Sequence, residues 1–294
     1  MKRVIALLLC VVMLCLLVAC GSEGNGSKPS GSAPESQQTE FTKISEGLEY
    51  TINPDGETCS VTGIGECTDT WIWIPDAVSM NIYSSDLYPV TGIADSAFYC
   101  NEEIQGIRMG KFTTSVGGYA FYGCLSLQVV ELGEQMLSLG EYSFGSTAIR
   151  EITIPASMET VCAWAFYACR NLTAVHISDL EAWFSISFGG IYANPLMLAG
   201  QMYMDGEVVT KVVVPDSVTG ILPWTFAGCK SLTEVHLHEN VTEIGQRAFL
   251  DCENLQRLVY SGTHEQWKMM VLGTYWDFSI EEFMIVCQDK QIKG

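Results

Sequence analysis

The sequence predicts a β-rich repeat solenoid, in which short strands stack as a parallel ladder between an N-terminal hairpin cap and short helical insertions. The main signal is a phenylalanine that follows a small residue and recurs six times, at spacings of 23, 23, 22, 60 and 23 residues. An aliphatic residue stands five positions before each one, and a short alternating apolar segment comes after it. Such regular spacing is typical of stacked units that cannot bury their apolar residues alone. The six are Phe98, Phe121, Phe144, Phe166, Phe226 and Phe249.

Composition and charge exclude several classes of protein. The chain has 294 residues, 48% of them hydrophobic, and 15 Lys and Arg against 34 Asp and Glu, which is a formal net charge of −19. A polyanion of this strength repels phosphate backbones, and no basic stripe offsets it, so the composition argues against nucleic-acid binding. The apolar share suffices for a sizeable core, which excludes a chain disordered throughout. The length allows one or two domains.

Residues 1–19 are predicted to be a lipoprotein signal peptide. A positive start at residues 2–3 precedes an apolar run over residues 4–18, which is too short to cross a bilayer comfortably. The run ends in the motif LVACG at residues 17–21, which resembles a bacterial lipobox and implies cleavage before Cys20 and acylation of that cysteine. The alternatives are an ordinary secretory signal with a chance cysteine and a short membrane anchor.

Residues 20–43 are predicted to be the lipidated cysteine and a disordered linker. Residues 21–40 contain no Val, Ile, Leu, Met or aromatic residue, so they cannot bury enough apolar area to offset the entropy lost on ordering. As a random coil, a linker of about 20 residues holds the folded part on the order of 25 Å from a membrane. Cleavage also removes Lys2 and Arg3, so the mature net charge is 13 − 34 = −21.

Residues 44–89 are predicted to form an N-terminal cap and the first strand unit. Two alternating segments, 48–52 and 58–61, flank the sequence NPDG at 53–56, which is a strong turn signal. They predict a hairpin that covers the first open end of the stack. The apolar segment 71–75 then begins the ladder.

Residues 90–262 are predicted to form the repeats, with a divergent insertion at 180–210. Apolar residues at i and i+2 face one side of a strand, and eight such strands at a spacing of about 4.8 Å form a ladder roughly 34 Å long. The 60-residue gap after Phe166 divides into one unit of 37 residues, which holds the insertion, and one of 23. Asp179 is placed to cap a short helix, and Asp205-Gly206 predicts a second hairpin. The eight strands begin with the aliphatic residues Ile72, Ile107, Val130, Ile152, Val175, Val212, Val235 and Leu258.

Residues 263–294 are predicted to be a C-terminal cap. Thr263 and Gln266 have the spacing of a capping box, which predicts a short helix that contains Trp267. Terminal units of solenoids are commonly atypical because they must present a polar outer face.

The repeats resemble the BspA-like leucine-rich repeats of bacterial surface proteins. The resemblance is carried by VTGIADSAF at 90–98, by VTGI at 218–221 with FAGCKSL at 226–232, and by VTEIGQRAF at 241–249. It covers roughly residues 45–290, with departures at Ser143, Cys162 and 222–225 that each affect a single unit. The resemblance implies a leucine-rich-repeat stack and a role in adhesion or recognition, because family members are associated with matrix-protein binding and co-aggregation.

The cysteines predict a buried repeat position rather than a disulfide framework. Of 12 cysteines, Cys10 and Cys15 leave with the signal peptide and Cys20 carries lipid, so nine remain. Five follow a repeat phenylalanine by two or three residues, a position suited to a small apolar side chain. The odd number and the lack of a paired Cys-x-x-Cys motif argue against a zinc site. Cys59 and Cys67 are either bridged or free. The five are Cys100, Cys124, Cys169, Cys229 and Cys252.

The outward side of the ladder is the predicted binding face, because residues beside the buried aliphatics point to solvent. A His/Glu metal site is one hypothesis, since imidazole and carboxylate can share a transition metal. His176 and His236 are expected to be separated by the strand of Val213, about 9.6 Å apart, which is too far for both to bind one metal ion. His236 and His238 lie on one strand, and a metal site that uses these two remains an alternative. A solvated face without metal or cofactor is favoured. The candidate residues are Trp73, Arg108, Glu131, Glu151, His176, Glu234, His236 and His238.

The sequence contains no recognisable catalytic motif. Gly-x-Ser-x-Gly, Walker-type and HExxH patterns are absent, and the four histidines have no nucleophile partner. We therefore predict a non-enzymatic protein of the bacterial cell envelope, anchored by lipid, facing the exterior and binding extracellular protein or glycan ligands. Two alternatives stay open. One is capture of a solute or metal for a transporter, in a pocket between the insertion and the strand face, and the other is a structural role in the envelope.

Overall fold

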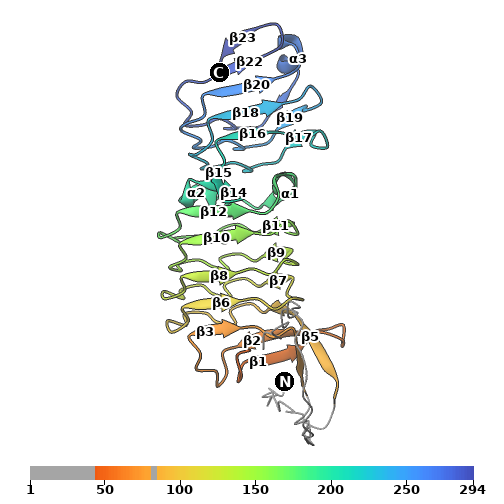
Figure 1. Cartoon of the computed structure of the whole chain (residues 1–294), viewed down its shortest axis with the longest axis vertical. Helices are drawn as coiled ribbons and strands as arrows, with labels where there is room; N and C mark the ends of the chain where they lie inside the picture. Colours follow the sequence, from red (N-terminus) through yellow and green to blue (C-terminus); the bar gives the residue numbers. More distant parts are fainter. Residues whose placement is uncertain (1–43, 81–84) are drawn as a thin grey trace, which may run out of the picture.

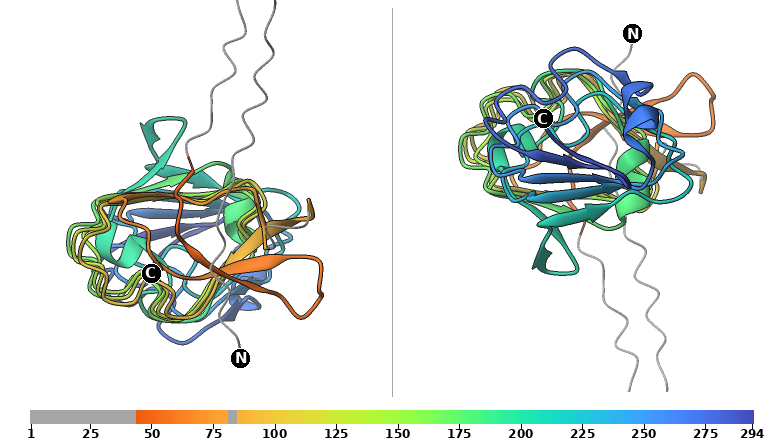
Figure 2. Two further views of the ribbon diagram at one scale, coloured as in Figure 1. Left: turned by 90° about the horizontal axis from the view of Figure 1, so that it is seen from below. Right: turned by 90° about the horizontal axis from the view of Figure 1, so that it is seen from above.

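The computed structural model describes residues 44–80 and 85–294. The predicted signal peptide, Cys20 and the linker lie outside the described residues. The described part is an elongated stack of coils, with the first coils at one end and the last at the other (Figure 1). Viewed along the stack, the coils largely superpose (Figure 2). No helix in this part of the chain is long and apolar enough to cross a membrane. The predicted solenoid is confirmed.

Short parallel strands form a ladder along one side of the stack, which we call the strand ladder. All eight predicted strands are present, and β14 and β22 add two that the sequence analysis did not predict. Each ladder strand buries one apolar side chain, such as Val130 of β8, and exposes the residue after it at least partly. The ladder strands are β3 (Trp71–Trp73), β6 (Gly106–Arg108), β8 (Val129–Glu131), β10 (Glu151–Ile154), β12 (Ala174–Ile177), β14 (Met202–Met204), β16 (Lys211–Val213), β18 (Glu234–Leu237), β20 (Arg257–Tyr260) and β22 (Met284–Val286).

The strand ladder is divided into three paired segments, β3 to β8, β10 to β14 and β16 to β22. The first division, between β8 and β10, falls where the unit is one residue short, with Ile152 only 22 residues after Val130. The second falls at the insertion, because β14 pairs with β12 on one side and antiparallel with β15 (Glu207–Val208) on the other. This hairpin projects beyond the outline of the coils (Figure 2).

The insertion confirms two local predictions. Asp179 accepts a hydrogen bond from the Ala182 amide at 2.7 Å and caps α1 (Leu180–Ser185). Asp205 and Gly206 form the turn of the β14–β15 hairpin with φ of 53° and 80°, the positive values that a type I′ turn requires. A second short helix, α2 (Leu196–Ala199), follows the strand β13 (Ser187–Phe188).

A second series of parallel strands carries the aliphatic residues that stand five positions before each repeat phenylalanine. The strands pair in two sheets, β5 through β13 and β17 through β21. The aliphatic side chains that precede a repeat phenylalanine are buried, from Val116 at 2% exposure to Leu139 at 0%, whereas Val271 and Leu272 of the last strand in the series precede no repeat phenylalanine and are exposed. These strands are β5 (Leu87–Ile93), β7 (Ser115–Val116), β9 (Ser138–Leu139), β11 (Thr160–Val161), β13, β17 (Gly220–Ile221), β19 (Glu243–Ile244) and β21 (Val271–Leu272).

Both ends of the stack are capped. The predicted hairpin is β1 (Glu49–Ile52) and β2 (Cys59–Gly63), and β2 joins the second series by pairing with β5. An unpredicted strand, β4 (Ala77–Ser79), pairs antiparallel with β5. At the other end, Thr263 and Gln266 form the predicted capping box of α3 (His264–Lys268), and β23 (Gln291–Lys293) pairs antiparallel with β22.

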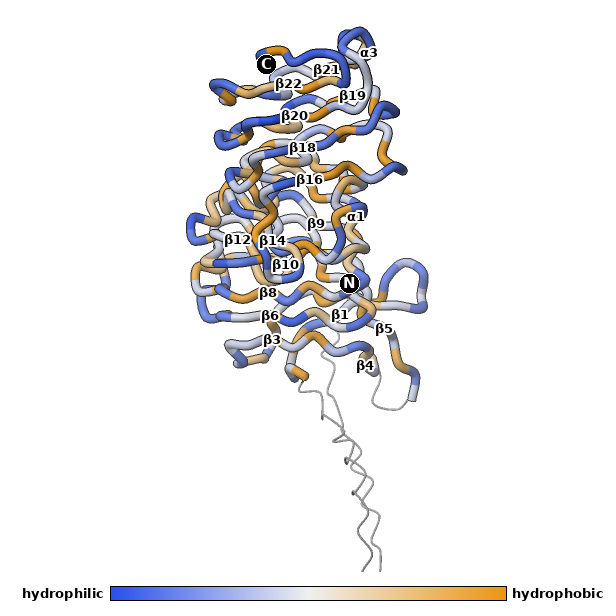
Figure 3. Tube along the Cα trace, turned by 45° about the horizontal axis from the view of Figure 1, so that its top comes forward, coloured by the Kyte–Doolittle hydropathy of each residue, from blue (hydrophilic) through white to orange (hydrophobic). Residues whose placement is uncertain are grey.

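The six repeat phenylalanines form the centre of the core and are at most 2% exposed. Phe98, Phe121, Phe144 and Phe166 stack in series, with ring centroids 5.0, 5.3 and 6.0 Å apart. At the insertion, Phe184 of α1 packs edge-on against Phe226 at 5.3 Å, and Phe226 stacks on Phe249 at 5.6 Å. The insertion thereby adds an aromatic ring to the column of the later repeats. Along the described residues, hydrophobic and hydrophilic residues alternate within the coils (Figure 3).

The cysteine position is confirmed for four of its five members. The thiols of Cys124, Cys169 and Cys252 each donate to the carbonyl of a phenylalanine in the preceding coil at 3.1 Å, and Cys229 is also buried. Burial raises the pKa of Cys124 to about 12. Cys100 is exposed, so its assignment was wrong. It lies two rather than three residues after its phenylalanine, in a turn with φ of 54°. Cys59 and Cys67 are both free thiols.

Candidate functional site

The outward side of the strand ladder carries pairs of charged and aromatic side chains. In parallel register, the outward residue of one strand lies beside that of the next, so ladder positions that are 23, 27 or 35 residues apart in the sequence become neighbours. Three clusters result, one on each segment of the ladder. They are centred on Arg108, His176 and Glu234.

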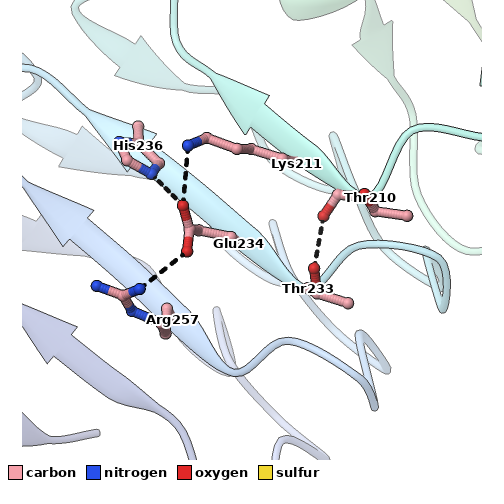
Figure 4. Close-up of polar contacts among 6 residues, drawn as sticks. All are labelled: Thr210, Lys211, Thr233, Glu234, His236 and Arg257. Carbon is pink, nitrogen blue, oxygen red and sulfur yellow. Dashed lines mark hydrogen bonds and ion pairs between the residues drawn. The ribbon is translucent and has the colours of Figure 1, made fainter.

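Glu234 is the centre of the largest cluster (Figure 4). It lies on β18 between Lys211 of β16 and Arg257 of β20, because the register aligns the three positions. The Lys211 ammonium lies 3.0 Å from one carboxylate oxygen and the Arg257 guanidinium 3.3 Å from the other. His236, two residues further along the same strand, donates a hydrogen bond to the carboxylate. This hydrogen bond and that from Lys211 lower the pKa of Glu234 to about 2.

The N-terminal cluster joins three predicted residues. Trp73, Arg108 and Glu131 are aligned in register on β3, β6 and β8. The Arg108 guanidinium lies 5.3 Å from the Trp73 ring centroid, a cation–π contact, and 3.4 Å from the Glu131 carboxylate. A hollow of about 480 Å³ opens at the ends of these strands, and its lining adds Asp76, Lys111 and Glu134.

The central cluster joins Glu151 and His176, whose carboxylate and imidazole are 3.5 Å apart, with Tyr203 stacked on the His176 ring at 5.1 Å. The sequence analysis missed Tyr203, because the long 37-residue unit conceals the extra ladder strand β14. For the same reason the expected separation of His176 from His236 was wrong. Both β14 and β16 lie between their strands, rather than the strand of Val213 alone.

The repeats identify the family. A model of the BspA type leucine rich repeat region matches six copies, over residues 90–190 and 200–272, which is more than half of the chain. The chain belongs to the BspA-type leucine-rich-repeat family. Leucine-rich repeats are typically non-catalytic binding scaffolds. The clusters of this BspA-type chain consist of ion pairs and stacked rings.

Solved structures show similar repeats. A leucine-rich repeat protein from Bacteroides capillosus is 29% identical over 45% of this chain and 95% of its own, with a TM-score of 0.40. The T. pallidum leucine rich repeat protein is 20% identical over 77% and 83% of the two chains, with a TM-score of 0.37. A leucine rich cell surface protein from Faecalibacterium prausnitzii is 15% identical over 80% and 99%, with a TM-score of 0.34. No curated protein matches this BspA-type chain.

His238 does not join the Glu234 cluster. Its Nε2 atom forms a hydrogen bond of 3.0 Å with the Pro215 carbonyl, and its buried Nδ1 has no hydrogen-bond partner among the described residues. His236 instead turns to Glu234 on its own strand. Within residues 44–80 and 85–294, no group of three or more His, Cys, Asp or Glu side chains is arranged to hold a metal ion.

A second hollow, of about 500 Å³, lies beside the insertion of this BspA-type solenoid. Glu181 and Phe184 of α1 line one side, and residues 217–223 with Glu243 line the other. It opens next to β17 and β19, which belong to the second series of strands. It therefore does not lie between the insertion and the strand ladder, where the solute-capture alternative expects a pocket.

The three clusters suit recognition of a polar macromolecular surface. Lys211 and Arg257, which pair with Glu234, have about half of their side-chain surface exposed, and so do Arg108 and Glu131. Exposed ion pairs of this kind contribute about 0–1 kcal/mol each to stability, so a partner can exchange one for its own charge at little cost. The rigid ladder holds them at fixed positions.

Proposed function

We propose that the protein is a lipid-anchored protein of the bacterial cell surface that binds host or microbial macromolecules through the strand ladder, without catalysis. The observation that carries the proposal is the row of exposed, paired charges on a rigid parallel ladder. Opposite charges held in register select a complementary surface and exclude others. The lipobox-like LVACG sequence and the polar linker support attachment to a membrane through a flexible tether.

Binding is tested with the mature chain from residue 21, which carries no lipid, on an array of matrix proteins, mucins and glycans. Saturable binding to one class is expected. The double substitution Arg108→Ala/Arg257→Ala should weaken binding, because it removes one cation from each of two clusters. Arg170→Ala is the matched control, since Arg170 is an exposed arginine on a turn outside the ladder. A blank array with folded protein would contradict the proposal and favour solute capture or a structural role.

Anchoring is tested separately in cells that express the full chain. Metabolic labelling with palmitate should label the wild-type protein and move it to the membrane fraction. Cys20→Ser should remain unlabelled and unprocessed, because the thiol is the acylated group in proteins with a lipobox. Equal labelling of both proteins would overturn the assignment of Cys20.

A further inference from the structure

Two columns of aromatic side chains line the turns that follow β5, β7, β9, β11 and β13, away from the three ladder clusters. The first column, which we call the stacked column, consists of the residues two positions before Phe121, Phe144 and Phe166. Its fourth member stands two positions before Asn194, which occupies the corresponding place in the insertion. The other, the platform column, comes from the residue directly after the phenylalanine. The stacked column is Tyr119, Tyr142, Trp164 and Tyr192, and the platform column is Tyr99, Tyr122 and Tyr167.

The rings of the stacked column cover one another. Tyr119 and Tyr142 lie 5.0 Å apart at an interplanar angle of 20°, and Tyr142 and Trp164 lie 5.9 Å apart at 5°. Backbone hydrogen bonds between successive turns hold the column, such as that from the Tyr119 amide to the Glu141 carbonyl at 2.8 Å. Both faces of Tyr142 are therefore covered, by Tyr119 and by Trp164, and its edge points sideways.

The platform rings are turned by nearly a right angle to the stack. Tyr122 and Tyr167 both lie at 77° to Tyr142, at 5.9 and 5.7 Å. Because the faces of Tyr142 are covered, its edge meets the faces of these two rings, the T-shaped arrangement that aromatic quadrupoles favour. Tyr99 stacks on Tyr122, with ring centroids 5.7 Å apart and an interplanar angle of 12°. Tyr167 thus rests one face on the stacked column and Tyr99 rests one face on Tyr122, and each of the two turns its other face outward.

Exposure and a glycine agree with an outward platform. Tyr99 is 53% and Tyr167 38% exposed, and Tyr122 is half-buried between them. Gly145 takes the platform position between Tyr122 and Tyr167, and the Tyr122 ring leans over it. A Cβ atom at Gly145 would lie 2.8 Å from Tyr122 Cδ2, so a side chain there would displace the ring.

The charges around the platform select its ligand. The four turns, at 94–100, 117–124, 140–147 and 162–169, contain no Lys or Arg, and they carry the exposed acids Asp95 and Glu141. Nucleic-acid bases also stack on aromatic rings, but phosphates and anionic glycans are repelled by these acids and by the mature charge of −21. A ligand with apolar ring faces, many hydroxyl groups and no negative charge fits this surface.

We propose that Tyr99, Tyr122 and Tyr167 form a platform for a neutral polysaccharide built of pyranose rings. The C–H faces of the sugars stack on the outward ring faces, and the phenol groups hydrogen-bond to sugar hydroxyls. With about 4.8 Å between coils, Tyr122 lies one coil from Tyr99, and Tyr167 lies two coils, about 9.6 Å, beyond Tyr122. One sugar residue of an extended chain advances by a distance similar to one coil spacing, so the chain runs parallel to the long axis. This site is separate from the strand ladder and goes beyond the function proposed above.

The test is affinity electrophoresis of the mature chain in native gels that contain xyloglucan, galactomannan or hyaluronan. At least one of the neutral polymers should retard the wild-type protein, whereas anionic hyaluronan should not. Tyr99→Ala/Tyr167→Ala should weaken the binding by about tenfold or more, the effect of losing a few contacts of this size. Tyr99→Phe/Tyr167→Phe should keep most of it, because the rings remain. Tyr275→Ala is the matched control, since Tyr275 is 57% exposed on the last coil, outside the platform.

Absence of retardation by both neutral polymers would overturn the proposal, as would equal retardation of the wild type and the double alanine variant, or retardation by hyaluronan alone. If thermal unfolding shows that the double variant is misfolded, Tyr99→Ala alone decides, because Tyr99 is the most exposed ring of the platform. Arg108→Ala/Arg257→Ala should leave the retardation unchanged. Failure of the platform is thereby distinguished from failure of the ladder.

Discussion

At the scale of single residues, the alternation of buried and exposed side chains on the ladder follows from the two-residue period of a strand. Val130 is buried and Glu131 exposed, and Val235 is buried while His236 is half-buried beside it, as the sequence analysis predicted. The partners of each exposed residue could not be predicted in the same way. They depend on the register between coils, and a single extra strand such as β14 changes which side chains become neighbours.

The inside and outside assignments are tested by one pair of substitutions. Phe121 is fully buried between Phe98 and Phe144, so Phe121→Ala should lower the free energy of unfolding by about 3–5 kcal/mol. Arg108 has half of its side chain exposed, and Arg108→Ala should cost less than about 1 kcal/mol. Denaturant unfolding followed by circular dichroism measures both. Equal and small effects would refute the assignments.

The lowered pKa of Glu234 predicts a pH dependence of stability. Because its pKa is about 2 in the folded protein, below its ordinary value of 4.5, the carboxylate stabilises the fold above pH 4.5 and loses that contribution as the pH falls toward 2. The wild type should therefore be more stable than Glu234→Gln at neutral pH, and their melting temperatures should converge between pH 4.5 and 2. A difference that stays constant across this range would contradict the role of the cluster formed by His236 and Lys211.

At the scale of elements, local signals predicted the pieces of the insertion but not how they dock. Asp179 and Asp205-Gly206 act through neighbours within three residues, which is why the helix cap and the hairpin turn were readable. The docking depends on distant contacts. Asn194 takes the place of a repeat phenylalanine, and its side-chain amide donates to the carbonyls of Trp224 and Thr225, about thirty residues away in the sequence.

The docking of α2 is tested by two glycines with similar backbone conformations. Gly228 and Gly56 have φ of 80° and 74°, so an alanine at either is strained by about 1–2 kcal/mol. At Gly56 the new Cβ meets nothing within 4 Å, whereas at Gly228 it would lie 2.4 Å from the Cα of Met197 in α2. Gly228→Ala should therefore lower the melting temperature clearly more than Gly56→Ala. Similar losses would show that α2 does not pack on this turn.

At the scale of the whole molecule, stability is expected to be the sum of coils and of the contacts between neighbours. Deleting residues 117–139 removes one complete unit and joins Val116 to Gly140, so every later coil keeps its register. This variant should fold and unfold in one cooperative transition. Deleting residues 117–127 removes about half a unit, places strand residues where turns belong, and should abolish cooperative unfolding by heat in circular dichroism. Equal behaviour of the two deletions would argue against the solenoid.

The sequence by itself determined the repeat period, the buried columns, the caps and the outward positions of the ladder, because each depends on residues within one unit and its periodic copies. Tertiary structure decided which outward residues touch. It added β14 and β22 to the ladder, brought Lys211, Glu234 and Arg257 into one cluster, and turned Cys100 outward. It also aligned the platform tyrosines. These outcomes depend on the register and direction of stacking between coils, which the order of residues along one coil does not encode alone.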